Sequence, residues 1–123
     1  YREINLQRTD SRYTLLHFWG SWCAPCIENL PKISQLYESY NDKAEVISFP
    51  YDLKKDFSKT KSLIQKYSMN WIQIVQPRDD PFQKADVVNQ LRIAAFPTYI
   101  LLDSNGKILL RTSDISEIEK YVK

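Results

Sequence analysis

The two cysteines of the chain, Cys23 and Cys26, lie three positions apart in the segment Gly20-Ser-Trp-Cys-Ala-Pro-Cys26. At this spacing two thiols can close a disulfide across the first turn of a helix. One thiolate can then attack a substrate disulfide, and the other can resolve the mixed disulfide. We expect Cys23 to be the exposed nucleophile and Cys26, one turn deeper, to be the more buried resolving thiol. The pair predicts dithiol-disulfide exchange.

The expected reactivity of Cys23 follows from its place between a strand and a helix. An apolar strand precedes the loop and a helix begins within it, so Cys23 is expected at a helix N-terminus. Unpaired N–H groups and the helix dipole there favour an anion and lower a thiol pKa from about 8.5 toward roughly 3.5–7.5. Pro25 suits the first turn because its missing N–H would be unpaired anyway. Ala24 and Pro25 add neither charge nor imidazole, so nothing between the cysteines makes the disulfide strongly oxidising.

Two other interpretations of the pair stay open. A structural zinc site needs about four ligands, and beyond the two thiols the chain offers only His17, with no second C-x-x-C and no H-x-x-x-H. The cysteines can also be an inert buried pair. We expect no metal.

Strand and helix signals alternate along the chain, without repeats or Gly/Ser linkers to divide it. We expect one α/β domain over residues 1–123, with a central mixed sheet, helices on both faces, and a C-terminal β-hairpin followed by a helix. At the hairpin turn, Asn105 and Gly106 are expected to supply positive φ angles. The predicted strands are 13–19, 44–51, 71–75, 98–103 and 107–112, and the predicted helices are 23–40, 56–67, 82–91 and 114–122.

Composition excludes several classes of function. Seventeen Lys and Arg stand against 15 Asp and Glu, without a run of five like charges, so nucleic acid is not an expected partner. Gly20 and Gly106, the two glycines, are too far apart for a phosphate-binding loop. The longest mostly apolar stretch, residues 93–102, is half the roughly 20 residues of a membrane helix, so we expect no membrane span. Because the chain starts at Tyr1, we expect that a signal peptide, an anchor or a further domain has been removed.

Three segments carry a resemblance to a known family: His17-Phe-Trp-Gly-Ser-Trp-Cys-Ala-Pro-Cys26, Ala95-Phe-Pro-Thr98 and Asp103-Ser-Asn-Gly-Lys107. Together they resemble the thioredoxin superfamily, and within it the TlpA/ResA-like branch of bacterial envelope thiol-disulfide oxidoreductases. The resemblance covers nearly the whole chain and implies a thioredoxin-like fold. It also implies a cis peptide bond at Phe96-Pro97 that faces the cysteines and offers backbone hydrogen bonds to an extended substrate strand. The expected substrate contacts are Trp22, Ala24, Pro25, Phe96 and Pro97.

The function that the resemblance implies is exchange with protein disulfides, with the chain acting as a reductant in the bacterial periplasm or cell envelope. An upstream electron donor would restore the dithiol, and the Cys23–Cys26 disulfide would be the only redox group. We expect a monomer. Two alternatives stay open: a redox-sensing or binding module of a larger envelope protein, and a thiol peroxidase. Related peroxidases carry Thr or Ser three residues before the reactive cysteine, where this chain has Gly20.

The chain departs from the family pattern at two positions. The best-known members carry a buried aspartate six residues before the first cysteine, where this chain has His17. Our hypothesis is that His17 relays the proton of Cys26; the alternative is a packed histidine, and in either case burial should lower its pKa. Relatives often carry glutamate three residues after the second cysteine, where this chain has Asn29 beside a Glu28 that we expect at the surface.

Overall fold

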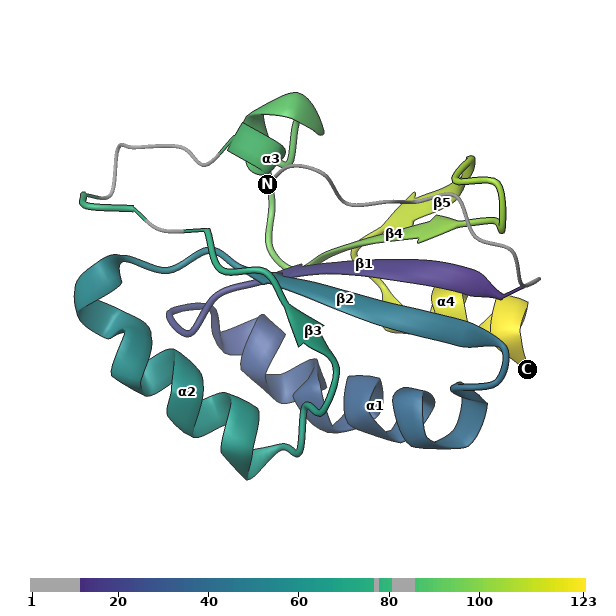
Figure 1. The fold of residues 1–123 in the computed structure, drawn as a ribbon, viewed down its shortest axis with the longest axis horizontal. Helices are drawn as coiled ribbons and strands as arrows, with labels where there is room; N and C mark the ends of the chain where they lie inside the picture. The colour runs from purple at the N-terminus through teal and green to yellow at the C-terminus, as the bar shows by residue number, and fades with distance from the viewer. Residues whose placement is uncertain (1–11, 77, 81–85) are drawn as a thin grey trace.

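A five-stranded sheet forms the centre of the molecule and carries helices on both faces (Figure 1). The computed structural model describes residues 12–76, 78–80 and 86–123. Along the chain its elements are β1 (Tyr13–Trp19), α1 (Ala24–Tyr40), β2 (Ala44–Pro50), the 3₁₀ turn η1 (Lys54–Asp56), α2 (Phe57–Lys66), β3 (Ile72–Gln73), α3 (Asp86–Gln90), β4 (Thr98–Leu102), β5 (Ile108–Thr112) and α4 (Ile115–Val122). No helix in these described ranges is long and apolar enough to cross a membrane.

The strand order is β3-β2-β1-β4-β5, which makes the sheet mixed. β2 lies parallel to β1, an arrangement that requires a crossover connection, which α1 provides. β3 runs parallel to β2, whereas β4 is antiparallel to both β1 and β5. The predicted mixed sheet and C-terminal hairpin are therefore confirmed.

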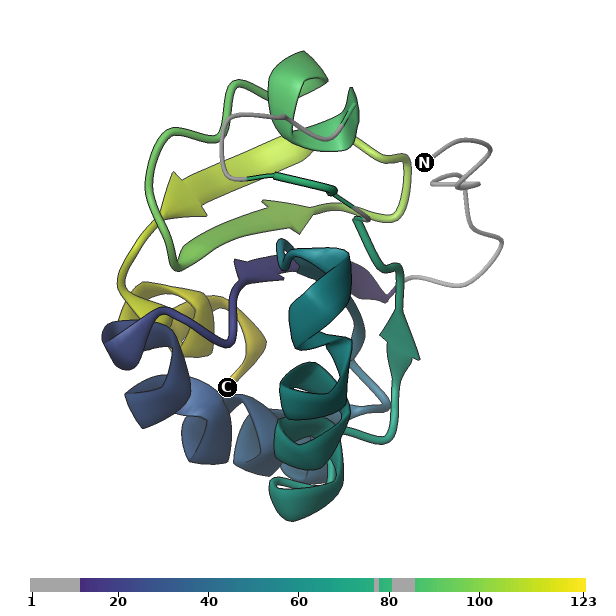
Figure 2. The same cartoon turned by 90° about the vertical axis from the view of Figure 1, so that its left-hand side faces the viewer.

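Strand β1 is buried on both sides because its alternate residues feed two cores. Leu15 packs with α1 and α4, while Leu16 and Phe18 pack with the short helix α3 on the opposite face. The two views show the same division, with α1, α2 and α4 on one side of the sheet and α3 on the other (Figures 1 and 2). This double coverage explains the nearly continuous apolar sequence of β1, which ends at the cysteine loop.

Two predicted elements differ from the structure by more than one residue at an end. The strand predicted at 71–75 shortens to β3, although the N–H groups of Ile74 and Gln76 still donate to Ser48 and Pro50 and keep the segment along β2. The helix predicted at 82–91 corresponds to α3, of which residues 86–90 are described; residues 82–85 lie outside the described part.

The backbone conformation predicted for Asn105 in the hairpin turn was wrong. Among the described residues, φ is positive only at Ser68, Arg92 and Gly106, so Asn105 does not share the conformation of Gly106. The Asp103 carboxylate accepts the N–H groups of Asn105 and Lys107, and its carbonyl accepts that of Gly106. The pairing of β4 with β5 also shifts register at the end of β4. The turn therefore has one residue with positive φ, Gly106, where two were predicted, because the hydrogen bonds to Asp103 hold the loop backbone in another conformation.

Candidate active site

A tight turn carries the chain from the end of β1 into α1. Its N–H···O bond joins Cys23 to the Gly20 carbonyl at 3.1 Å. Cys23 is the N-cap of α1, with an extended backbone, and Pro25 lies in the first helical turn. A Cβ at Gly20 would collide with the indole of Trp22, so the turn leaves no room for a side chain at this position. The sequence prediction that Cys23 stands at a helix N-terminus is confirmed.

Cys23 and Cys26 are joined by a disulfide, with their Cα atoms 5.2 Å apart. The Cys23 Sγ accepts a hydrogen bond of 3.2 Å from the Cys26 N–H, an arrangement that would also stabilise a Cys23 thiolate in the reduced protein. In the disulfide form Cys23 keeps 5% of its surface exposed and Cys26 none. Cys23 is thus the more accessible of the two, but it is far less exposed than we expected because neighbouring groups cover it.

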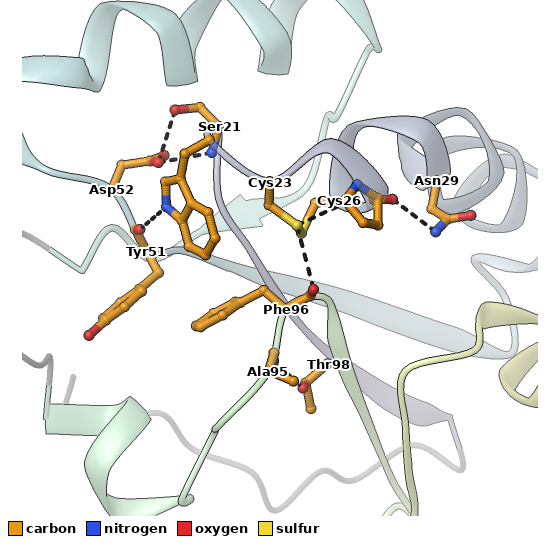
Figure 3. The surroundings of a disulfide bond; sticks show 11 residues. Ser21, Cys23, Cys26, Asn29, Tyr51, Asp52, Ala95, Phe96 and Thr98 are labelled. Atoms are coloured by element: carbon orange, nitrogen blue, oxygen red, sulfur yellow. Dashed lines mark hydrogen bonds between the residues drawn. A yellow bond between two sulfur atoms is a disulfide. The ribbon is translucent and has the colours of Figure 1, made fainter. Parts of the chain in front are cut away.

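One of these neighbours is the loop before β4. The Cys23 Sγ lies 3.5 Å from the Phe96 carbonyl oxygen, although the two residues are far apart in sequence (Figure 3). The Phe96–Pro97 peptide bond is cis, and Pro97 is buried. Thr98 Oγ1 donates to the Ala95 carbonyl at 2.6 Å and braces the loop. The backbone of Phe96 therefore meets the disulfide.

The surface beside the disulfide is aromatic. Trp22 is 53% exposed, and its indole N–H donates to the Tyr51 carbonyl at 2.8 Å. Its ring packs edge-on against Phe96 with centroids 5.4 Å apart, and Phe96 stacks on Tyr51 at 5.1 Å. Ala24 and Pro25 are exposed in the same loop. Four of the five predicted contact residues are thus exposed or half-buried, while Pro97 is buried.

His17 is fully buried on β1. Its Nδ1 lies 2.7 Å from the Ser48 Oγ, which also accepts the indole N–H of Trp71 at 2.7 Å. The imidazole lies parallel to the rings of Trp19 and Tyr99, at centroid distances of 6.1 and 5.5 Å. Burial lowers the pKa of His17 to about 3, in the direction predicted, so the ring is neutral at physiological pH. Within the described part of the chain, its Nε2 has no hydrogen-bond partner.

The sequence analysis missed Asp52, which follows β2. This carboxylate is fully buried and accepts hydrogen bonds from Ser21, in the turn before Cys23 (Figure 3). An acidic residue after an apolar strand is the only sequence signal, and it does not reveal which loop the residue meets. Glu28, by contrast, is exposed as predicted. The described residues contain no group of three or more His, Cys, Asp or Glu side chains that could hold a metal ion.

The fold and the site together define a dithiol-disulfide exchange domain: a cysteine pair at a helix N-terminus after the central strand β1, faced by an X-Pro loop. A family model described as thioredoxin-like matches residues 10–108, so the chain belongs to the thioredoxin-like family. Its homologues and its disulfide-forming C-x-x-C pair identify it as a thiol-disulfide oxidoreductase.

Relatives of known name agree with this assignment. The chain is 26% identical to the thiol-disulfide oxidoreductase ResA of Bacillus thuringiensis (strain Al Hakam), over 99% of this chain and 68% of the relative. It is 29% identical to ResA of Geobacillus thermodenitrificans, over 87% of this chain and 58% of the relative. Among solved structures, a thiol-disulfide oxidoreductase from Bacteroides fragilis matches with a TM-score of 0.73 and 27% identity, covering 98% of this chain and 87% of that one.

Proposed function

We propose that the chain reduces disulfides in protein substrates through attack by Cys23. The Cys23 thiolate forms a mixed disulfide with one substrate sulfur and releases the other as a thiolate. The Cys26 thiolate then attacks the Cys23 Sγ, so the second substrate thiolate leaves and the Cys23–Cys26 disulfide forms. The substrate gains two electrons and the chain loses two, which an upstream thiol donor returns. The cysteine pair needs no further cofactor for this cycle.

The observation that carries this proposal is the N-cap position of Cys23. Its sulfur accepts the Cys26 N–H at the start of α1, whereas Cys26 is fully buried behind it. A thiolate at Cys23 therefore gains stabilisation from the helix N-terminus and is the sulfur that a substrate reaches first. The support for Cys26 as the resolving thiol is that it is already within bonding reach of Cys23.

The substrate is proposed to dock as an extended segment beside the disulfide. Trp22, Ala24, Pro25 and Phe96 would contact its side chains, and the backbone of the Phe96–Pro97 loop would bind its main chain. This arrangement would bring a substrate sulfur to Cys23, because the Phe96 carbonyl lies 3.5 Å from the Cys23 Sγ.

The direction of electron flow is proposed to be reduction of the substrate. A disulfide is a strong oxidant when its reduced form is strongly stabilised. Ala24 and Pro25 carry no charge or imidazole that would stabilise a Cys23 thiolate in this way, so the Cys23–Cys26 disulfide is not expected to be a strong oxidant. We expect a potential nearer to the about −270 mV of thioredoxin than to the about −120 mV of DsbA. We also propose that the chain acts as a monomer in the bacterial cell envelope, on the strength of its resemblance to the TlpA/ResA-like branch.

Trapping of substrates tests this function. The reduced Cys26→Ala variant, added to an envelope extract of the organism that makes the protein, should form mixed disulfides that dithiothreitol releases. A Cys23→Ala/Cys26→Ala variant is the matched control and should capture nothing. Absence of dithiothreitol-sensitive adducts from the Cys26→Ala variant, with its Cys23 thiol intact by titration, would contradict exchange with protein substrates.

A further inference from the structure

Asp52 is a buried carboxylate whose two oxygens bind two different parts of the molecule. Its Oδ1 accepts the backbone N–H and the hydroxyl of Ser21, each at 2.9 Å. Its Oδ2 accepts the Thr60 hydroxyl on α2 at 2.6 Å. Asp52 is fully buried, and Ser21 and Thr60 are nearly so. The carboxylate therefore links the turn before Cys23 to α2.

The residue that Asp52 holds is in the turn that places Cys23. Ser21 and Trp22 are the central residues of this turn, which the bond from the Cys23 N–H to the Gly20 carbonyl closes. The preceding residue, Tyr51, accepts the Trp22 indole N–H through its carbonyl. Two consecutive residues after β2 thus bind two consecutive residues of the turn, and both contacts are drawn in Figure 3.

The partners of Asp52 indicate why a carboxylate is present. Burial of a charge is costly unless hydrogen bonds satisfy it, and Asp52 receives three, from one amide and two hydroxyls. A carboxylate can accept two hydrogen bonds at one oxygen and a third at the other. It can therefore bind the N–H and the hydroxyl of Ser21 and, at the same time, the hydroxyl of Thr60. An apolar side chain at this position would leave the two buried Ser21 donors without a partner.

We propose that Asp52 is a positioning residue for disulfide exchange, which holds the Gly20–Cys23 turn so that the Cys23 sulfur stays on the Cys26 N–H. It touches neither the sulfurs nor the substrate and acts through Ser21. The hydrogen bond that it maintains stabilises the Cys23 thiolate, so loss of Asp52 should reduce the thiolate population at neutral pH. The inference deepens the proposed function, but its test uses the reduced protein alone and needs no substrate.

The direction in which the Cys23 pKa changes when Asp52 is replaced separates positioning from a direct action of the Asp52 charge. A nearby negative charge disfavours a thiolate, so removal of the charge alone would lower the Cys23 pKa. Loss of the turn geometry would raise it. Asp52→Asn removes the charge but keeps an oxygen that can accept from Ser21 and an amide that can donate to Thr60, so it isolates the two effects.

The experiment measures the pKa of Cys23 from the pH dependence of its alkylation by iodoacetamide in the reduced protein. Parent, Asp52→Ala, Asp52→Asn and Ser21→Ala are compared, with Asp42→Ala as a control that removes an exposed acidic residue far from the turn. All variants keep the other titratable or charged groups on the surrounding elements, which are His17 on β1, Cys26 and Glu28 on α1, Tyr51 after β2, Asp56 on η1 and Arg78 after β3.

The proposal predicts that Asp52→Ala raises the Cys23 pKa by about one unit, a roughly tenfold loss of thiolate below the pKa. Ser21→Ala should raise it less, because the backbone N–H still binds Asp52, and Asp52→Asn should stay near the parent. If Asp52→Ala does not fold, the test rests on Ser21→Ala: a raised Cys23 pKa in this variant supports positioning, and an unchanged one overturns it. An unchanged Cys23 pKa in both Ser21→Ala and Asp52→Ala, or a lowered pKa in Asp52→Ala, would overturn positioning. Failure to trap substrates would instead overturn the proposed function and leave this result standing.

Discussion

Cys23 and Cys26 differ in their surroundings although they are separated by a single helical turn. Cys23 caps α1 and accepts the Cys26 N–H, whereas Cys26 is fully buried. In the reduced protein we therefore predict that iodoacetamide at mildly acidic pH labels Cys23 first. Peptide mapping by mass spectrometry after a short exposure measures the order. Faster labelling of Cys26 would reverse the assignment of nucleophile and resolving thiol.

His17 offers a second prediction about a single residue. With its pKa lowered to about 3, the buried imidazole is a poor site for a net proton at neutral pH. A relay through His17 would have to take up a proton at one ring nitrogen and release a proton from the other. One of these nitrogens, Nδ1, is hydrogen-bonded to Ser48, so the relay would involve that hydroxyl. If His17 relays the proton of Cys26, His17→Asn should fold and attack substrates at the parent rate but release mixed disulfides more slowly across about pH 6–8.

Stopped-flow measurement of attack and release tests this role. Ser48→Ala is the companion variant, because it removes the hydroxyl that bonds to Nδ1 while keeping the imidazole. A relay predicts slower release in both variants. Equal release rates for His17→Asn and the parent would make His17 a packing residue only.

At the scale of elements, the β4–β5 hairpin yields a prediction about its turn. Gly106 has φ of 84°, in the left-handed region, whereas Asn105 does not. Gly106→Ala should therefore lower the free energy of unfolding by about 1–2 kcal/mol, while Asn105→Ala should change it little. Urea denaturation of both variants provides the comparison. An equal loss in both would support a turn in which Asn105 and Gly106 both have positive φ, against the observed conformation.

The elements that position the site were predictable because local patterns specify them. The apolar run of β1, the helical spacing of α1 and the Asn-Gly pair each predicted its element, and Cys23 at the start of α1 followed from them. The contacts between Asp52 and Ser21, and between His17 and Ser48, were not predictable. The first joins the second residue after β2 to the second residue after β1, and the other joins β2 to β1. Only the register of the folded sheet decides which of these side chains meet.

At the scale of the whole molecule, His17 couples stability to pH. Its pKa is about 3 in the folded protein and near 6.5 when unfolded, so between these values the unfolded chain binds more protons. Stability is therefore lost as pH falls below 6.5. From pH 7 to pH 5 the expected loss is about 2 kcal/mol.

This loss can be assigned because His17 is the only histidine of the chain. Urea unfolding of the oxidised protein at pH 7 and pH 5 should show the loss in the parent and not in His17→Asn, whatever the stability of the variant at pH 7. A loss of equal size in both proteins would show that another group causes the pH dependence.

The claim that the whole molecule is an exchange enzyme is tested most directly by turnover. The measurement is the rate at which dithiothreitol reduces a protein disulfide, such as that of insulin, with and without a catalytic amount of this chain. We predict that the parent accelerates the reduction many-fold and that Cys23→Ser does not, because the Cys23 thiolate forms the mixed disulfide. If the folded parent, with its cysteine pair shown to be reduced by dithiothreitol, gives the same rate as Cys23→Ser, the account of this chain as a thiol-disulfide oxidoreductase would be contradicted.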